Sequence, residues 1–281
     1  MSSSLLMSLY IYSHSYLISF MNISGIFSLL FCTTLFLSIG HASLAQKREF
    51  YEIKIYHLKT SEQEKRVDQY LEKAYLPALH RIGVKNIGVF KPVPTDSMAG
   101  KLIYVLTPAK SLDQLHALPQ RLDKDAAYLS AGADYINAAY NNPPYSRFES
   151  IILQAFKTMP VLKKSALTGP KSERIYELRS YEGHTEKIYR NKVKMFDDGG
   201  EVPLFDRLGF NAIFYGEVIA GSKMPNLMYI TTFANKASRD EHWKTFSNDS
   251  EWNKLKVDPQ YQNNVSKNTQ YFLYPTAYSD L

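Results

Sequence analysis

Two short segments of this sequence place an acid, a base and a tyrosine on alternate positions. The two sets are Glu52, Lys54 and Tyr56, and Glu177, Arg179 and Tyr181. Alternate residues of an extended strand share one face, so each set would present its three side chains together. An acid beside a base can form a structural ion pair, whereas an arginine can also hold a planar carboxylate with its rigid fork of donors. The residue types therefore indicate either an ion pair that fixes a sheet or a site for a polar ligand.

Both sets belong to a longer internal repeat. Segment 48–56 is matched by segment 172–181, so that Tyr51 recurs as Tyr176 with an offset of 125 residues. Pro77-Ala-Leu-His-Arg-Ile-Gly83 is matched by Pro203-Leu-Phe-Asp-Arg-Leu-Gly209 at nearly the same offset. A near-constant offset predicts two copies of one folding unit, with a site between the two halves.

The hydrophobic pattern predicts the same order of elements in each half. Alternation of apolar and polar residues and turn-rich breaks indicate strands at 50–57, 84–90, 101–107 and 147–156. Helices are expected from 61 and over 112–139, the second broken at Pro119 and again near Gly132. The second half repeats this with strands at 174–181, 211–219, 227–233 and 270–276, and helices at 185–208 and 236–256. The order β-α-β-β-α-β is the ferredoxin-like arrangement.

A ferredoxin-like sheet has helices on one face, so its other face needs a cover. The second copy can supply that cover. We therefore predict an α+β fold with two tandem ferredoxin-like domains, at 46–156 and 172–281, joined by a linker at 157–171. Their sheets would pack against each other as a pseudo-dimeric α/β barrel.

The two predicted faces of the first strand differ in chemistry. If Tyr51, Ile53 and Ile55 meet the helices of their own half, the two acid, base and tyrosine sets point into the barrel. They would then line a cavity together with aromatic residues of the neighbouring strands, Tyr104, Phe214, Tyr215 and Tyr229. Alternation alone does not decide which face is which, and a structural Glu177–Arg179 pair is the alternative, since an unpaired buried charge is costly.

The first 45 residues contain no Lys, Arg, Asp or Glu, and they include the apolar run 26–39 followed by Ala42-Ser-Leu-Ala45. This pattern is typical of a secretory signal peptide cleaved after Ala45, with Met1 or Met21 as the start. It predicts a periplasmic or secreted protein, and an uncleaved membrane anchor is the alternative. Because the single cysteine, Cys32, lies in this segment, the exported part would be held together by apolar packing without disulfides.

The formal net charge of +6 is dispersed, with acidic and basic residues interleaved, and the basic runs are too short for a nucleic-acid tract. The histidines lack the spacing of a metal site. His57 and His184 follow corresponding strands, close to where a barrel mouth would lie, and each is expected to be a surface histidine rather than a catalyst. The sequence shows no phosphate loop, nucleophile elbow or reactive cysteine. We therefore predict no metal and no cofactor. The expected partners are a small organic molecule and a second copy of the chain. Any catalysis would use a Tyr or Glu of the cavity as acid or base.

Tyr176-Glu-Leu-Arg-Ser-Tyr181 resembles the opening strand of the NIPSNAP family, and a second family motif is matched late in the chain by Trp243, Phe246, Asp249, Glu251 and Trp252. The first half is a weaker match. Lys54 replaces the arginine, and the positions of Phe246, Asp249 and Trp252 in the late motif are taken by Leu122, Asp125 and Tyr128. The resemblance implies the dimeric α/β-barrel fold but no secure reaction. Relatives on this barrel include haem-degrading monooxygenases. A haem- or quinol-handling monooxygenase, with His242 as candidate haem ligand, is therefore one alternative function, and an interaction module without a ligand is another.

Overall fold

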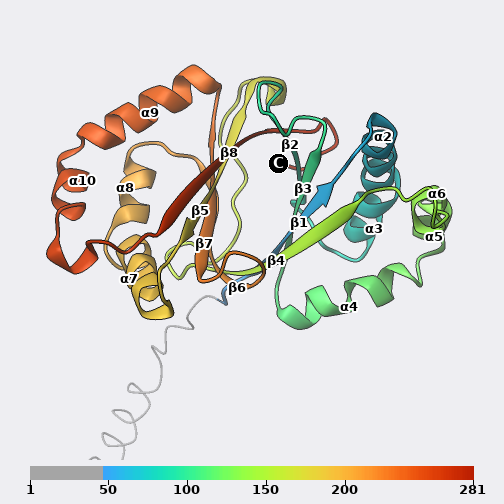
Figure 1. Cartoon of the computed structure of the whole chain (residues 1–281), viewed down its shortest axis with the longest axis horizontal. Coiled ribbons are helices and arrows are strands. Elements are labelled where there is room, and N and C mark those ends of the chain that lie inside the picture. The colour runs from blue at the N-terminus through green and yellow to red at the C-terminus, as the bar shows by residue number, and fades with distance from the viewer. Residues whose placement is uncertain (1–46) are drawn as a thin grey trace, which may run out of the picture. The chain divides into compact units, whose positions relative to one another are not determined.

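Eight strands form one closed antiparallel barrel in the computed structural model, which describes residues 47–281 (Figure 1). The predicted signal peptide lies outside the described residues. The elements of the first half are β1 (Phe50–His57), α2 (Ser61–Tyr70), the π-helix η1 (Leu71–Tyr75), α3 (Leu76–Arg81), β2 (Gly88–Pro92), β3 (Leu102–Ala109), α4 (Leu112–Leu122), α5 (Ala126–Ala131), α6 (Ala133–Ile136) and β4 (Arg147–Ala155).

The second half repeats this order after the short 3₁₀-helix η2 (Lys171–Glu173). Its elements are β5 (Ile175–Glu182), α7 (Glu186–Asp197), α8 (Glu201–Arg207), β6 (Ala212–Ala220), β7 (Asn226–Phe233), α9 (Lys236–Asn248), α10 (Ser250–Leu255), the 3₁₀-helix η3 (Pro259–Tyr261) and β8 (Lys267–Pro275). In Figure 1 the helices α2–α6 lie on one side of the strands and α7–α10 on the other.

The strand order around the barrel is β1-β3-β2-β8-β5-β7-β6-β4. Each half thus contributes four neighbouring strands in the ferredoxin-like order, and the predicted α+β barrel is confirmed. The structure adds how the halves join: β2 pairs with β8 between Phe90–Pro92 and Leu273–Pro275, and β4 pairs with β6 from Ile152 onward. Backbone hydrogen bonds at these two seams close the barrel. The division into domains at 156 and 172 stays a prediction.

Equivalent polar residues start the equivalent helices of the two halves. Thr60 accepts a hydrogen bond from the backbone of α2, and Thr185 does the same for α7. Ser111 and Asn235 cap α4 and α9 in the same way. Each cap satisfies an amide that would otherwise lack a partner at the helix start. The internal repeat therefore extends to the residues that fix where each helix begins.

The predicted long helices are broken where the chain must turn. The helix expected over 112–139 is three helices, α4 to α6, and the first break follows Leu122 rather than Pro119, which lies inside α4. The helix expected over 185–208 is split at Gly200, whose φ of +99° is readily adopted only by glycine. Within residues 47–281, no helix is long and apolar enough to cross a membrane.

The buried residues form three clusters, one inside the barrel and one between each half's strands and helices. Tyr51, Ile53 and Ile55 belong to the barrel cluster, whereas Tyr56 and Tyr181 pack under the helices. The predicted face assignment is therefore wrong: the acid, base and tyrosine sets face the helices. An eight-stranded barrel is just wide enough for side chains to fill it, which favours apolar residues inside.

Candidate functional site

Glu177 lies between β5 and α9 and is fully buried, with an exposed fraction of 0%. Its carboxylate accepts hydrogen bonds from Arg179 Nε at 2.7 Å, from Arg239 Nε at 2.8 Å and Nη2 at 2.7 Å, and from Trp243 Nε1 at 2.7 Å. Burial opposes its ionisation, but the hydrogen bonds from Arg239 and the charge of Arg179 hold the pKa of Glu177 below its ordinary value. The opening strand motif and the late helix motif thus meet at one carboxylate.

Arg179 continues this network toward the interior of the helix layer. Its guanidinium lies 3.6 Å from the centre of the Trp243 ring, and Nη1 donates to the Tyr181 hydroxyl at 3.0 Å. The hydroxyls of Tyr181 and Tyr229 are 3.0 Å apart. These contacts are those expected of the structural ion pair, because protein donors occupy both oxygens of Glu177. A ligand-binding role for Arg179, Tyr181 and Tyr229 stays a prediction.

The corresponding residues of the first half have different surroundings. Glu52 is partly exposed and accepts one hydrogen bond, from Ser150 Oγ at 2.7 Å. Lys54 Nζ lies 5.3 Å from the centre of the Phe148 ring, and Tyr56 accepts a hydrogen bond from Tyr135 at 3.1 Å. The helix positions that hold Arg239 and Trp243 in the second half are occupied by residues without such donors, Leu115 and Pro119. The first half therefore has no equivalent of the closed Glu177 network.

Among the predicted site residues, Tyr104 alone lines a pocket inside the barrel. This pocket lies at the barrel end where β1 finishes and β3 begins, and its volume is about 160 Å³. We call it the barrel-mouth pocket. Its apolar lining comes from both halves and consists of Ile55, Leu102, Tyr104, Ile151, Leu178 and Met228. Burial raises the pKa of Tyr104, so its hydroxyl stays protonated and can donate a hydrogen bond.

The rim of the barrel-mouth pocket carries two polar pairs. On one side His57 Nε2 lies 2.7 Å from Glu149 Oε1, and the Ser222 hydroxyl donates to Glu149 Oε2 at 3.1 Å. On the other side Lys223 Nζ donates to the Tyr271 hydroxyl at 3.0 Å. That hydrogen bond holds the pKa of Lys223 above its ordinary value, so the side chain is cationic at neutral pH.

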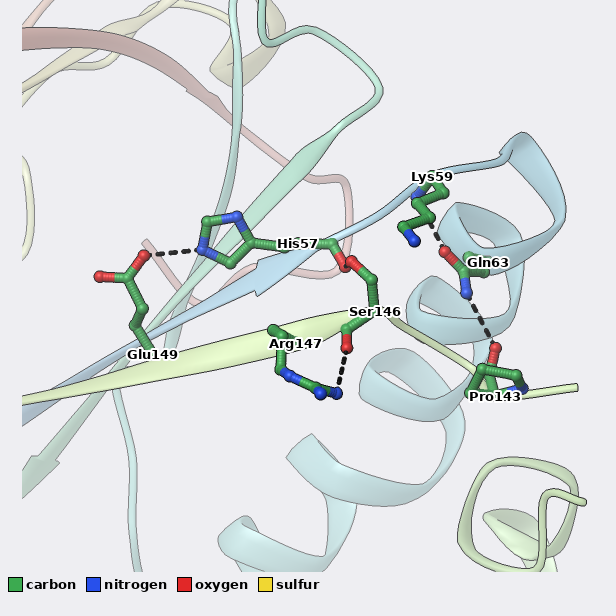
Figure 2. Close-up of a pocket in the computed structure, with 7 residues that line it drawn as sticks. All are labelled: His57, Lys59, Gln63, Pro143, Ser146, Arg147 and Glu149. Atoms are coloured by element: carbon green, nitrogen blue, oxygen red, sulfur yellow. Dashed lines mark hydrogen bonds and ion pairs between the residues drawn. The ribbon is translucent and has the colours of Figure 1, made fainter. Parts of the chain in front are cut away.

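An open groove adjoins the rim where β1 ends and β4 begins (Figure 2). Its volume is about 730 Å³, and it shares His57 and Glu149 with the barrel-mouth pocket. Figure 2 shows Gln63 between Lys59, whose backbone amide donates to it at 2.8 Å, and the Pro143 carbonyl, which accepts from it at 2.9 Å. The His57–Glu149 pair therefore marks the border between the open groove and the barrel interior.

The rim residues were not predicted as a site. His57 was expected to be an ordinary surface histidine, and Glu149, Lys223 and Tyr271 carry no motif. The available signal was the position of His57 at the end of the first strand, where a barrel would open.

His242, the candidate haem ligand, lies away from this pocket. Its Nδ1 is 2.7 Å from the Ser238 carbonyl oxygen, and its ring packs edge-on against Phe210 and Phe233 in the helix layer. In the part of the chain that the structure describes, no group of three His, Cys, Asp or Glu side chains is arranged to hold a metal ion.

Comparison with known proteins finds the NIPSNAP family model matched by residues 176–280. No curated protein matches the chain. A candidate monooxygenase from Lactobacillus acidophilus has a similar structure, with a TM-score of 0.53 and 11% identity over 81% of this chain and 94% of that one. A candidate monooxygenase from Fusobacterium nucleatum has a TM-score of 0.53 and 9% identity, over 82% and 93% of the two chains.

An anthrone oxidase-like protein has a TM-score of 0.50 and 8% identity, over 83% of this chain and 93% of that one. At such identities the likeness concerns the fold alone. The family match covers the second half of the barrel, including the Glu177 network and the helix that closes it. A NIPSNAP domain is therefore found at residues 176–280.

Proposed function

We propose that this protein binds a small organic ligand in the barrel-mouth pocket. The observation that supports this most is the composition of the pocket, which joins an apolar floor from both halves to a rim with a histidine, a carboxylate, a lysine and a tyrosine. Ligand sites are typically apolar concavities with a few placed polar groups. The sequence predicts a site between the halves that contains Glu177 and Arg179. The proposal keeps a site between the halves but assigns it to the rim around His57.

The size of the pocket limits the ligand. An apolar cavity of about 150 Å³ in another protein holds a benzene molecule, and the barrel-mouth pocket has a volume of about 160 Å³. A single ring therefore fits inside the barrel, and any larger substituent would extend into the groove of Figure 2. Export from the cytoplasm is part of the proposal and rests on the signal-peptide pattern of residues 1–45 alone.

A blocking substitution tests the proposed site. In Ile55→Trp, the larger side chain would fill the pocket, because Ile55 lines it and is largely buried. We expect wild type to bind at least one of three ring probes, phenol, benzoate or benzylamine, in ligand-observed NMR, and we expect Ile55→Trp to bind none of them. Ile219→Trp is the matched control, since Ile219 is 39% exposed and does not line the pocket. Equal binding by both variants, or no binding of any probe by wild type, would contradict the proposal.

The haem alternative fits the described residues poorly. A pocket of about 160 Å³ is smaller than the ~300–1,000 Å³ of pockets for drug-sized ligands, and a haem needs more space than one ring. Haem titration of the purified protein should therefore give the spectrum of free haem, without a shifted Soret band. A shifted band that disappears in His57→Ala would instead favour the haem alternative. An interaction module without a ligand remains the third alternative, and failure of all three ring probes would favour it.

A further inference from the structure

The His57–Glu149 pair has the arrangement of an oriented base. Glu149 Oε1 lies 2.7 Å from His57 Nε2, so the carboxylate favours the tautomer that carries its proton on Nε2. Within residues 47–281, Nδ1 makes no hydrogen bond, and Figure 2 shows this nitrogen on the side of the ring away from Glu149. Nδ1 therefore keeps a free lone pair that can accept a proton.

The pair remains accessible to a ligand. The side chains of His57 and Glu149 are 36% and 40% exposed, and both line the barrel-mouth pocket. The second oxygen of Glu149 is held by Ser222, which fixes the carboxylate against the imidazole ring. A carboxylate placed in this way stabilises the imidazolium ion that forms when the histidine takes a proton.

A cation lies on the same rim. Lys223 lines the barrel-mouth pocket and is oriented by its hydrogen bond to Tyr271. Its backbone φ is +65°, a left-handed conformation that is uncommon for residues other than glycine. Such outliers cluster at functional sites, where a particular side chain is needed despite the backbone cost. Lys223 thus supplies a positive charge to the pocket that His57 also lines.

We propose that the barrel-mouth pocket binds a single ring that bears a weakly acidic hydroxyl group, as in a phenol, and that His57 accepts the hydroxyl proton while Lys223 binds the resulting oxyanion. The proposal rests on the function proposed above and names the ligand class of that site. The ligand's O–H bond breaks and its electron pair stays on the oxygen. The proton forms a new bond to Nδ1, so the step needs no oxidant or further reactant.

The other charged and titratable groups near the rim are compatible with this step. Glu149 on β4 faces His57, Tyr104 on β3 and Tyr271 on β8 line the same pocket, and Glu182 on β5 acts on the charge of Lys223. The exposed cations Lys59 and Arg147 border the groove. With two carboxylates close to one lysine, the rim suits a neutral hydroxyl that ionises after binding better than a ligand that arrives as an anion.

4-Nitrophenol is a suitable probe, because its ionised form is yellow and its neutral form is not. Titration of the probe from acid to alkaline pH, with and without protein, measures the pH at which it ionises. We expect the bound probe to ionise about one pH unit below the free probe. In His57→Asn the ring should still bind but this shift should be smaller, because only Lys223 then stabilises the ionised probe. Glu149→Gln, which keeps the shape of the side chain, should retain only part of the shift.

Lys223→Met should weaken binding of the ionised probe about tenfold, as expected for the loss of one charge-assisted hydrogen bond. The matched controls are His184→Asn, at the turn after β5, and Lys244→Met, which is 73% exposed on α9. Both should behave as wild type, and thermal melts of every variant check that the fold is kept.

Binding without a shifted ionisation, or a full shift in His57→Asn, would overturn this proposal and leave the proposed function standing. Failure of 4-nitrophenol, phenol, benzoate and benzylamine to bind at all would overturn both.

Discussion

Replacing Glu177 with alanine should lower the free energy of unfolding by about 3–5 kcal/mol, the loss typical when one partner of a buried ion pair is removed. The carboxylate is fully buried, pairs with Arg179 and Arg239, and accepts a hydrogen bond from the indole N–H of Trp243. Without it, both guanidinium groups would lose their shared carboxylate and the indole N–H would lose its acceptor. Urea unfolding, followed by tryptophan fluorescence and far-UV circular dichroism, measures the loss.

The first half supplies a matched control. Glu52 occupies the equivalent strand position but is partly exposed and accepts a single hydrogen bond from Ser150. Glu52→Ala should therefore cost about 1 kcal/mol or less. Similar losses in both variants would show that the Glu177 network does not stabilise the fold in the way its geometry indicates.

The decline of the free energy of unfolding at low pH gives a second measure of the contribution of Glu177. The pKa of Glu177 is lower in the folded protein than in the unfolded chain. Its contribution is therefore complete above the unfolded-state pKa and is lost as the pH falls through the folded-state value. Glu177→Gln should flatten the decline of unfolding free energy below about pH 4. A decline as steep as that of wild type would assign acid sensitivity to other groups.

Replacing Lys192 alone with methionine should also cost about 3–5 kcal/mol. Lys192 and Glu201 form a buried pair between α7 and α8, with Nζ 2.9 Å from Oε2, and their side chains are 7% and 3% exposed. Burial raises the pKa of Glu201, against the lowering effect of the Lys192 charge. Removing the lysine would leave a carboxyl group without its partner beside the Phe196 ring. Urea unfolding measures the loss at neutral pH.

The double variant Lys192→Met/Glu201→Met separates the cost of an unpaired group from the value of the pair. Because the ring of Phe196 already lies 4.5 Å from Nζ, the site offers apolar contacts to two methionines. We expect the double variant to regain most of the stability lost in Lys192→Met, since buried ion pairs can often be replaced by apolar residues at little cost. Lys236→Met, in an exposed pair with Asp240, should change stability much less than the single variant. A double variant less stable than Lys192→Met would show that the pair itself is needed.

The fold could be predicted from the sequence because matching segments in the two halves indicate the same topology for both. The matching of Tyr51 with Tyr176, and of Gly83 with Gly209, predicts the same order of strands and helices in both halves. Which side of each strand faces the barrel interior and which faces the helices could not be predicted in this way. Both faces of a barrel strand are buried here, so alternation distinguishes the faces without telling which one meets the helices. Glu177 is held by Arg239 and Trp243, which lie more than 60 positions further along the chain on α9.

The candidate site was predicted only in its location between the halves. Tyr104 was expected in the cavity and lines it, whereas His57 and Glu149 come from two strands whose pairing is set by the barrel. Lys223 comes from the turn between β6 and β7, and Tyr271 lies on β8. In the barrel β5 lies between β7 and β8, so the contact of Lys223 with Tyr271 depends on the strand order. Single residues contributed by separate strands leave no motif in the sequence, which is why sequence reasoning missed them.

Methyl NMR of the methionine side chains tests the ligand site most directly. Met228 lines the barrel-mouth pocket, whereas Met195 is buried beside Lys192 in the helix layer. Addition of 4-nitrophenol to protein labelled at the methionine methyl groups should shift the Met228 signal by the ring current of the bound probe and leave the Met195 signal unchanged. A shift of Met195 with an unchanged Met228 would place the probe under the helices and contradict a ligand site inside the barrel.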